Sequence, residues 1–432
     1  MTGRVRAALS LPWREPLAVA AGLGARDGLL TLLSGTGTGR SWIGCEPETI
    51  VVTRANCGLF DTLRAPGWDQ GVVGLAAYDG GARAATGERD GDWPDLILGR
   101  YPGFLAFDAD ARSVTAYGWG EDEAGAQVAA ERAAQWLETA GEAPVPEPPS
   151  NRFDSEAEPQ AYADAVAQVI DRIAAGDLFQ ANIARAWSGR LRAGAAPFDL
   201  FLRMSAAGGS AYGAYWRIGD RALVSNSPEL FLTLEPEGRI EARPIKGTRP
   251  RDPDPHRDAA LAAELLASAK ERAENLMIVD LMRNDLARVA VPGTVAVERL
   301  FEIQSLPTVH HLVSTVTGQA VPGAGPADVL EATFPPGSIT GAPKHQAMKL
   351  IAAHEQPRGP WCGSLFMLDD RGGLTASVLI RTVSLVRDGE VWRWRTLAGA
   401  GITADSDPAA ELAETGDKIA AIRAGLVGDQ LV

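Results

Sequence analysis

Two pairs of glutamates, far apart in the chain, have the spacing needed to bind one cation together. Glu271 and Glu274 lie three residues apart in the segment KERAENLMIVDLMRND, and Glu411 and Glu414 repeat that spacing in ELAETGDK. Residues i and i+3 share one face of a helix. Two such helices facing each other would offer four carboxylates to Mg²⁺, which prefers oxygen ligands. Taken singly, each pair is more often a solvated helix face.

A lysine in the segment RPIKGTRPR is a candidate nucleophile. Lys246 stands between Ile245 and Gly247, and three arginines flank it within a few residues. Like charges nearby disfavour the ammonium form, which is one way to make a lysine nucleophilic. We expect a tight loop here, in which Gly247 lets the backbone approach a ligand closely. The alternative is a solvated basic turn.

Two glycine-rich segments could bind an anion. Phe334–Lys344 (FPPGSITGAPK) precedes a helical pattern, so its backbone N–H groups and the Ser338 hydroxyl could face a carboxylate. Thr396–Gly401 (TLAGAG) predicts a second turn with free amides at Gly399 and Gly401. The alternatives are a simple helix cap for the first segment and a hairpin end for the second.

Composition narrows the class of protein. The chain has 432 residues and a net charge of −14, which argues against wholesale nucleic-acid binding. The three cysteines (Cys45, Cys57 and Cys362) form no CxxC pair and no HExxH is present, so neither a disulfide framework nor a zinc site is expected. We see no signal peptide and no apolar run approaching about 18 residues, so we expect a cytoplasmic protein without a membrane span.

Hydrophobic periodicity divides the chain into two parts. Residues 1–145 predict short strands and one helix, residues 146–160 a proline-rich connection, and residues 161–432 the part that carries the chemistry. The two parts are expected to contribute interleaved strands to one fold. The predicted helices are Glu121–Ala140, Ala161–Ala175, Asp258–Arg272, Pro326–Ala332, Lys344–Ala353 and Pro408–Leu426. The predicted strands include Phe179–Trp187, Ala222–Val224, Leu230–Leu234, Val378–Val386 and Val391–Leu397.

In their order along the chain, these motifs resemble the chorismate-utilising enzymes, a family that includes anthranilate, isochorismate, salicylate and aminodeoxychorismate synthases. The resemblance rests on GDLFQANIAR, SNSPELFL, RPIKGTRPR, KERAENLMIVDLMRND, HHLVST, FPPGSITGAPK, SVLIRTV, GAGITADSDP and ELAETGDK, and covers about residues 155–425. It implies an α+β fold in which two large antiparallel sheets form a sandwich core surrounded by helices. The active site would lie in the cleft between them.

Two positions discriminate within that family. Members that add water have a basic lysine where this chain has Gln180, and anthranilate synthases have alanine where it has Lys246. The resemblance therefore implies an aminating enzyme of the aminodeoxychorismate synthase type, acting toward para-aminobenzoate and folate. An anthranilate synthase large subunit remains the alternative. A non-catalytic regulatory or binding subunit that keeps the fold is the alternative from a different class.

The resemblance also implies the role of each site residue. Lys246 would form a covalent adduct with chorismate, Glu229 would be the general acid, and Glu271, Glu274, Glu411 and Glu414 would hold Mg²⁺. The implied substrate-binding residues are Gln180, Gly247, Thr248, His311, Ser338, Trp361, Arg381, Gly399, Gly401 and Lys418. Among these, Trp361 departs from the family, which commonly has tyrosine at this position.

The source of nitrogen is expected to lie on another chain. A glutaminase needs a cysteine nucleophile in a glycine-rich elbow with a partner histidine. None of the three cysteines has that context. We therefore expect a separate glutamine amidotransferase subunit as partner, and we expect free ammonia to replace it.

Overall fold

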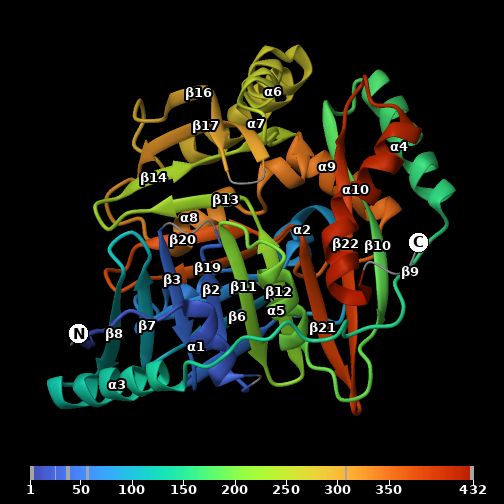
Figure 1. Cartoon of the computed structure of the whole chain (residues 1–432). Helices are drawn as coiled ribbons and strands as arrows, with labels where there is room; N and C mark the ends of the chain where they lie inside the picture. The colour runs from blue at the N-terminus through green and yellow to red at the C-terminus, as the bar shows by residue number, and fades with distance from the viewer. Residues whose placement is uncertain (1–3, 25, 36–38, 55–57, 307–308, 429–432) are drawn as a thin grey trace.

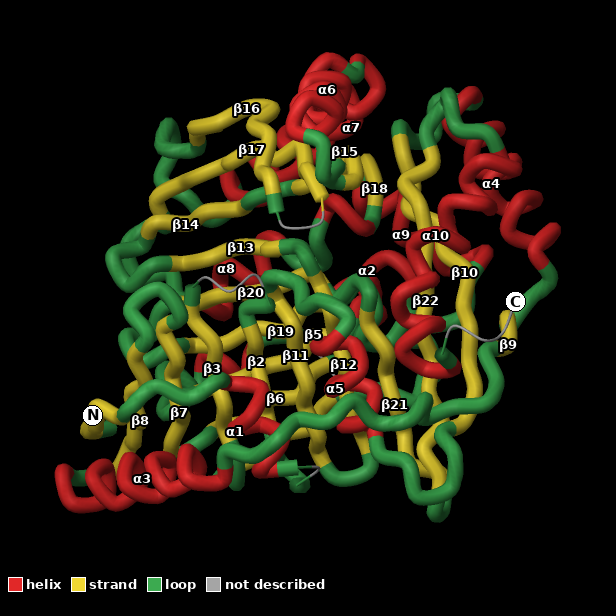
Figure 2. Tube along the Cα trace, in the orientation of Figure 1, coloured by secondary structure: helices red, strands yellow, loops and turns green. Residues whose placement is uncertain are grey.

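Two antiparallel sheets form the centre of the molecule, and helices cover their outer faces (Figures 1 and 2). The computed structural model describes residues 4–24, 26–35, 39–54, 58–306 and 309–428. Cys57 lies outside these ranges, and Cys45 and Cys362 are buried free thiols. The architecture confirms the predicted α+β sandwich.

The first sheet mixes strands from both halves of the chain. Its order is β1 (Val5–Leu11), β8 (Ser113–Gly120), β7 (Gly103–Asp108), β3 (Arg40–Gly44), β2 (Leu30–Leu33), β11 (Tyr212–Ile218), β12 (Arg221–Ser227), β21 (Thr382–Asp388), β22 (Val391–Ile402), β10 (Gln180–Arg190) and β18 (Gly341–Ala342). A short strand, β9 (Asp154–Ser155), pairs with β10.

The second sheet is built in the same way. Its order is β15 (Ile245–Pro250), β17 (Val309–Gln319), β14 (Arg239–Ala242), β13 (Leu230–Leu234), β20 (Leu374–Val378), β19 (Ser364–Leu368), β5 (Val72–Ala76), β6 (Leu96–Arg100) and β4 (Thr49–Thr53), with β16 (Ala296–Ser305) paired to β17.

The helices within the described residues are short and mostly peripheral. They are α1 (Pro16–Leu23), α2 (Tyr78–Thr86), α3 (Glu123–Trp136), α4 (Pro159–Ala174), α5 (Pro197–Ala206), α6 (Pro255–Ala267), α7 (Ala269–Ala287), α8 (Pro326–Thr333), α9 (Lys344–His354) and α10 (Pro408–Val427). One-turn 3₁₀ helices occur at Asp61–Arg64, Leu137–Thr139 and Gly337–Ile339. No helix in these ranges is long and apolar enough to cross a membrane.

Alternation along the strands explains how the layers hold together. On β5, Val73 and Leu75 point into the layer between the sheets, where they join Trp216 and Leu223 of the first sheet. Val72 on the same strand joins a different core, which includes residues of α7, α8 and α9. A strand buried on both faces contributes apolar area to two layers at once, and this burial is the main favourable term in folding.

Capping residues decide where the two site helices begin. Asp407 accepts a hydrogen bond from the Ala410 amide and Pro408 occupies the first turn, so α10 begins where the sequence predicts. The predicted helix Asp258–Arg272 is wrong as one element, because Ser268 ends α6 and caps α7 by accepting from the Glu271 amide. This places Glu271 in the first turn of a new helix.

Three further predictions differ from the structure. The predicted turn Thr396–Gly401 lies inside β22, which pairs with β10 as far as Ile402. The predicted strand Val378–Val386 is interrupted at residues 379–381, between β20 and β21. The RPIKGTRPR loop is instead the edge strand β15, with a register irregularity between Ile245 and Thr248.

Candidate active site

A buried acid stands at the start of β13. Glu229 accepts a hydrogen bond of 2.8 Å from the Ser338 hydroxyl, which is held in the 3₁₀ turn Gly337–Ile339. Burial raises the pKa of Glu229 to about 7, while the Ser338 hydrogen bond and the positive charge of Lys246 act in the opposite direction. A carboxyl group with this pKa can hold a proton near neutral pH and donate it, as a general acid must.

Lys246 lies in the irregular part of β15. Gly247 has φ +80°, and a Cβ at this position would lie 2.8 Å from the Glu271 carboxylate and from Leu265. The backbone conformation therefore favours glycine, and the missing Cβ leaves room for the Glu271 and Leu265 side chains. The glycine next to the lysine is thus explained by the irregular pairing of β15.

The charges around Lys246 differ from those that the sequence predicts. Arg249 lies 3.0 Å from Glu264 and 3.6 Å from Glu271, and Arg251 forms an ion pair of 2.8 Å with Asp258. Two of the three flanking arginines, Arg249 and Arg251, are therefore paired with acids of α6 and α7. The carboxylates of Glu229, Glu274 and Glu414 all feel the charge of Lys246. Tertiary structure thus surrounds this lysine with acids.

A neutral histidine lies opposite the lysine strand. His311 on β17 is buried and its Nδ1 lies 2.9 Å from the Thr248 hydroxyl. Burial and the charge of Arg381 lower the pKa of His311 to about 4, against the effect of a hydrogen bond with the Gly247 backbone. The imidazole is therefore uncharged at neutral pH, and it can orient a ligand through hydrogen bonds without adding charge.

Arg381 has no acidic partner among the described residues. It lies between β20 and β21 with φ +50°, a backbone conformation that is uncommon for a residue with a Cβ. Desolvation lowers the pKa of its guanidinium. The residue is nevertheless exposed, so a ligand can reach its guanidinium, whose two parallel N–H groups match a carboxylate. Its effect on His311 places it in the same site.

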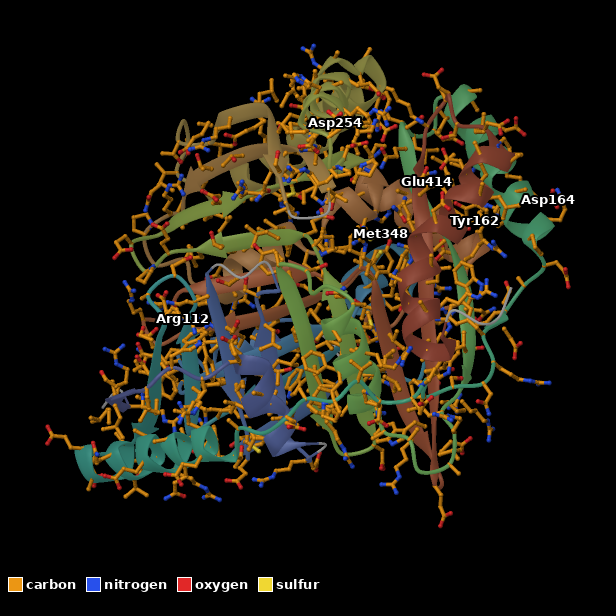
Figure 3. The ribbon with its side chains drawn as sticks, viewed as in Figure 1. Arg112, Tyr162, Asp164, Asp254, Met348 and Glu414 are labelled. Atoms are coloured by element: carbon orange, nitrogen blue, oxygen red, sulfur yellow. The ribbon has the colours of Figure 1, made fainter. Side chains whose placement is uncertain are left out.

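Glutamates of α7 and α10 act on one another through their charges. Burial raises the pKa of Glu274; Lys246 and Lys270 oppose this effect, and the charges of Glu271 and Glu411 add to it. For Glu414, burial is outweighed by nearby ammonium groups, Lys418 first, and the pKa is lowered. Figure 3 shows Glu414 on α10 beside α4, whose Tyr162 also feels its charge.

Asn275 fixes the position of α7 relative to the lysine strand. Its side-chain amide donates to the carbonyls of Pro244 and Leu312, at 3.5 Å each, and accepts from Ser314 at 2.5 Å. Pro244 immediately precedes β15, and Leu312 and Ser314 belong to β17. This buried network holds Glu274, the neighbour of Asn275, near Lys246.

A divalent cation fits the donor set, although the site is not preassembled. Within the described ranges, no three His, Cys, Asp or Glu side chains form a group ready to hold a metal ion. The four glutamates nevertheless offer oxygen ligands, which hard cations prefer. The charge of Glu411 acts on Glu274 across the two helices, and burial raises the pKa of Glu274 despite the nearby Lys246 and Lys270.

Strands β10 and β22 close the other side of the site. Lys418 donates to the Gly399 carbonyl at 2.9 Å and pairs with Glu414 at 2.6 Å, which links β22 to the carboxylates. A Cβ at Gly399 would lie 2.3 Å from the Ile183 backbone carbonyl oxygen, so glycine is needed there for the two strands to pair. Gly399 and Gly401 therefore reach the site from a strand, and not from a turn.

Gln180 is fully buried and its side chain has no hydrogen-bond partner within the described part of the chain. The side-chain oxygen of Asn182, on the same face of β10, is also unpaired. An unsatisfied buried polar group costs about 1–3 kcal/mol. Such groups in a native protein call for an explanation, and a ligand that supplies the missing bonds is one.

A buried arginine, which sequence reasoning missed, supports several of these elements. Arg358 is 1% exposed, forms a bidentate ion pair with Glu355 at 2.8 Å, and donates to the carbonyls of Asn182 and Ile339. Its guanidinium lies 4.6 Å from the ring centre of Tyr78 and 5.0 Å from that of Trp361. The only signal in the sequence is its position three residues before Trp361.

A cavity of about 500 Å³ lies beside the site, between the two sheets. Of the predicted site residues only His311 lines it, together with residues such as Trp42, Tyr212 and Arg243. It is therefore adjacent to the group of residues described above and does not coincide with it.

The chain belongs to the chorismate binding enzyme family, whose members match residues 45–424. It is similar to aminodeoxychorismate synthase component 1 of Klebsiella aerogenes and of Escherichia coli, at 39% identity to each, over 81% of this chain and 75% of each relative. It is nearly as similar to anthranilate synthase component 1 of Aeropyrum pernix, at 37% identity over 82% of this chain and 77% of the relative.

Solved structures agree with the fold. Anthranilate synthase component I of Streptococcus pneumoniae has a TM-score of 0.77 at 24% identity, covering 89% of this chain and 92% of that one. The menaquinone-specific isochorismate synthase of Escherichia coli has a TM-score of 0.76 at 20% identity, covering 99% and 95%. The predicted family and fold are therefore confirmed. The relatives include enzymes that form different products from each other, so the similarity does not assign the reaction of this chain.

Proposed function

We propose that this chain aminates chorismate to 4-amino-4-deoxychorismate, with ammonia as the nitrogen source. The observation that carries the proposal is the buried acid Glu229, which accepts a 2.8 Å hydrogen bond from Ser338 and whose pKa responds to the charge of Lys246. A nucleophile and a general acid in one site can catalyse a displacement: the nucleophile attacks carbon while the acid protonates the leaving oxygen.

The chemistry proceeds in two displacements. The Lys246 amine attacks C2 of chorismate, the diene electrons shift, and the C4 oxygen leaves as water after Glu229 protonates it. Ammonia then attacks C4, the electrons shift back, and the lysine leaves from C2. The net change is replacement of the 4-hydroxyl by an amino group with release of one water, so Lys246 and Glu229 are the catalytic residues.

Binding groups surround this pair on two sides. Arg381 is proposed to hold the enolpyruvyl carboxylate, with help from the Gly399 and Gly401 amides and from Trp361. Gly247, Thr248, Ser338 and Lys418 are proposed to face the ring carboxylate, and His311 the ring. Gln180 is proposed to lie beside the reacting carbons, where it offers no base to activate water.

Glu271, Glu274, Glu411 and Glu414 are the residues proposed to hold Mg²⁺, which when bound supplies a Lewis-acid contact that orients the ring carboxylate. The relatives named component 1 support a further proposal, that ammonia is delivered from glutamine by a separate amidotransferase subunit.

Anthranilate synthesis is the second candidate, because the Aeropyrum pernix relative is nearly as similar. A product assay separates the two. The purified chain is mixed with chorismate, Mg²⁺ and ammonium at mildly alkaline pH, and the product is identified by chromatography and mass. Aminodeoxychorismate is expected. Anthranilate would overturn the proposal, and absence of any conversion would favour a non-catalytic role or an obligate complex.

A further inference from the structure

The chain uses lysine very sparingly. It contains five lysines and 36 arginines. Lys246, Lys270 and Lys418 lie at or beside the carboxylates of the site, Lys344 is held by Asp285 and two backbone carbonyls, and Lys349 is exposed on α9. Four of the five lysines therefore lie at carboxylates, whereas the chain uses arginine at most of its basic positions, and a lysine differs from an arginine in carrying a compact ammonium group.

Lys270 has no role in the chemistry proposed above. It is the second residue of α7, and its ammonium nitrogen lies 4.0 Å from a Glu274 oxygen. Its charge acts on Glu274 and also on Glu414 of α10. Lys270 therefore serves the carboxylates of both helices at once. Its side chain is 61% exposed, so it can move away without disturbing the core.

Each of the four carboxylates has a protein partner that a cation would have to replace or share. Glu271 interacts with Arg249 at 3.6 Å, and Glu411 accepts from Ser406 at 2.7 Å. Glu414 pairs with Lys418 at 2.6 Å. These partners are anchored elsewhere: Arg249 to Glu264, Ser406 to the Thr403 amide and Lys418 to the Gly399 carbonyl.

Glu274 is different, because its partner Lys270 has no second hydrogen bond or ion pair among the described side chains. An arginine in this place could grip one carboxylate through two parallel bonds and keep both of its oxygens occupied. An ammonium is a point charge that can be shared between two carboxylates and released. The distance of 4.0 Å fits a loosely held counter-ion better than a fixed ion pair.

We propose that Lys270 is a resident counter-ion of the carboxylate cluster, which steadies α7 against α10 without a metal and opposes binding of a divalent cation there. The inference rests on the metal site of the proposed function, and it makes Lys270 a positioning residue. The Lys270 ammonium weakens the affinity of the four carboxylates for Mg²⁺. Binding of Mg²⁺ to them therefore depends more strongly on the anionic substrate.

The test measures Mg²⁺ binding without substrate. Mg²⁺ is titrated by calorimetry into the wild-type chain and into Lys270→Gln, Lys270→Arg and the exposed control Lys349→Gln. Two unit charges about 4 Å apart interact by about 1 kcal/mol even in water, so Lys270→Gln is expected to bind Mg²⁺ about fivefold more tightly. Lys270→Arg is expected to bind more weakly than wild type, and Lys349→Gln like wild type.

Thermal melting gives a second readout. In EDTA, Lys270→Gln is expected to melt at a lower temperature than wild type, because the carboxylates of α7 and α10 then repel each other without a counter-ion. Saturating Mg²⁺ should remove the difference. Glu414→Ala serves as a reference that lacks one of the proposed ligands and should bind Mg²⁺ poorly.

Unchanged or weaker Mg²⁺ binding by Lys270→Gln would overturn the inference, and so would the absence of Mg²⁺ binding by both wild type and variant. The proposed function fails separately. If Lys270→Gln binds Mg²⁺ more tightly but the product assay yields anthranilate, the role of Lys270 stands and the assignment of the reaction falls.

Discussion

The hydroxyl of Ser338 donates a 2.8 Å hydrogen bond to the carboxyl group of Glu229, although the two residues are 109 positions apart in the chain. Both side chains are 7% exposed. The bond favours the ionised carboxylate, whereas burial favours the protonated acid, and burial is the larger effect. The balance leaves the pKa of Glu229 at about 7, where a small change in either partner alters the fraction of protonated acid.

The first prediction concerns pH. Because the acid must be protonated to donate, formation of the Lys246 adduct should slow as pH rises through about 7. Adduct formation is measured by mass spectrometry without ammonia, so that ionisation of ammonia does not enter the profile. Ser338→Ala removes a hydrogen bond that lowers the pKa of Glu229. In this variant the fall in the rate of adduct formation should therefore occur at higher pH than in wild type. Ser338→Thr keeps the hydroxyl and is the control; an unmoved profile in Ser338→Ala would contradict the assignment.

The second prediction concerns the nucleophile. Lys246→Ala should form no covalent adduct with chorismate and should lose most turnover, because no other amine replaces it at C2. Adduct mass and steady-state rate with ammonium are the measurements. Lys349→Ala, an exposed lysine on α9, should behave like wild type. Turnover by Lys246→Ala at the wild-type rate would remove this lysine from the mechanism.

The third prediction concerns Arg381. A charged hydrogen bond to a ligand contributes about 1.5–3 kcal/mol, so Arg381→Ala should raise KM for chorismate about 10- to 100-fold. The variant should keep the stability of wild type, because Arg381 is exposed and has no acidic partner among the described residues. Steady-state kinetics and thermal melting test both parts. Arg371→Ala, in an exposed turn, is the control, and an unchanged KM in Arg381→Ala would place chorismate elsewhere.

The fourth prediction concerns Gln180. Leucine has a similar volume and no polar atoms, so Gln180→Leu should stabilise the protein by about 1–3 kcal/mol, since both unpaired side-chain atoms disappear. Turnover should fall because the site loses its polar group at this position. Urea unfolding measures the first effect and the product assay the second. A less stable variant would mean that the Gln180 side chain is satisfied in solution, for example by buried water.

Local chemistry accounts for the parts of the fold that the sequence predicts well. Strand Leu230–Leu234 matches β13, and the helix predicted from Pro408 begins there because Asp407 and Pro408 act within one turn of chain. The i,i+3 spacing of the glutamates is likewise a property of a helix alone. The family resemblance identified the chorismate binding enzymes, which the comparisons confirm.

Where the sequence misleads, the deciding contacts are long-range. The glycines of Thr396–Gly401 favour a turn locally, but they lie in β22 because this segment pairs with β10 up to Ile402. Along the chain Lys246 has arginine neighbours, whereas in space it acts on Glu229, Glu274 and Glu414.

The sequence by itself determined the family, the sandwich fold, the helix that carries Glu411 and Glu414, and the residues available for chemistry. Only the tertiary structure decided the charge around Lys246, the raised pKa of Glu229, the lack of an acidic partner for Arg381 among the described residues, and the effect of Lys270 on carboxylates of two helices. The physical reason is that spacing, caps and periodicity act within a few residues. Burial and charge depend on which distant segments the two sheets bring together.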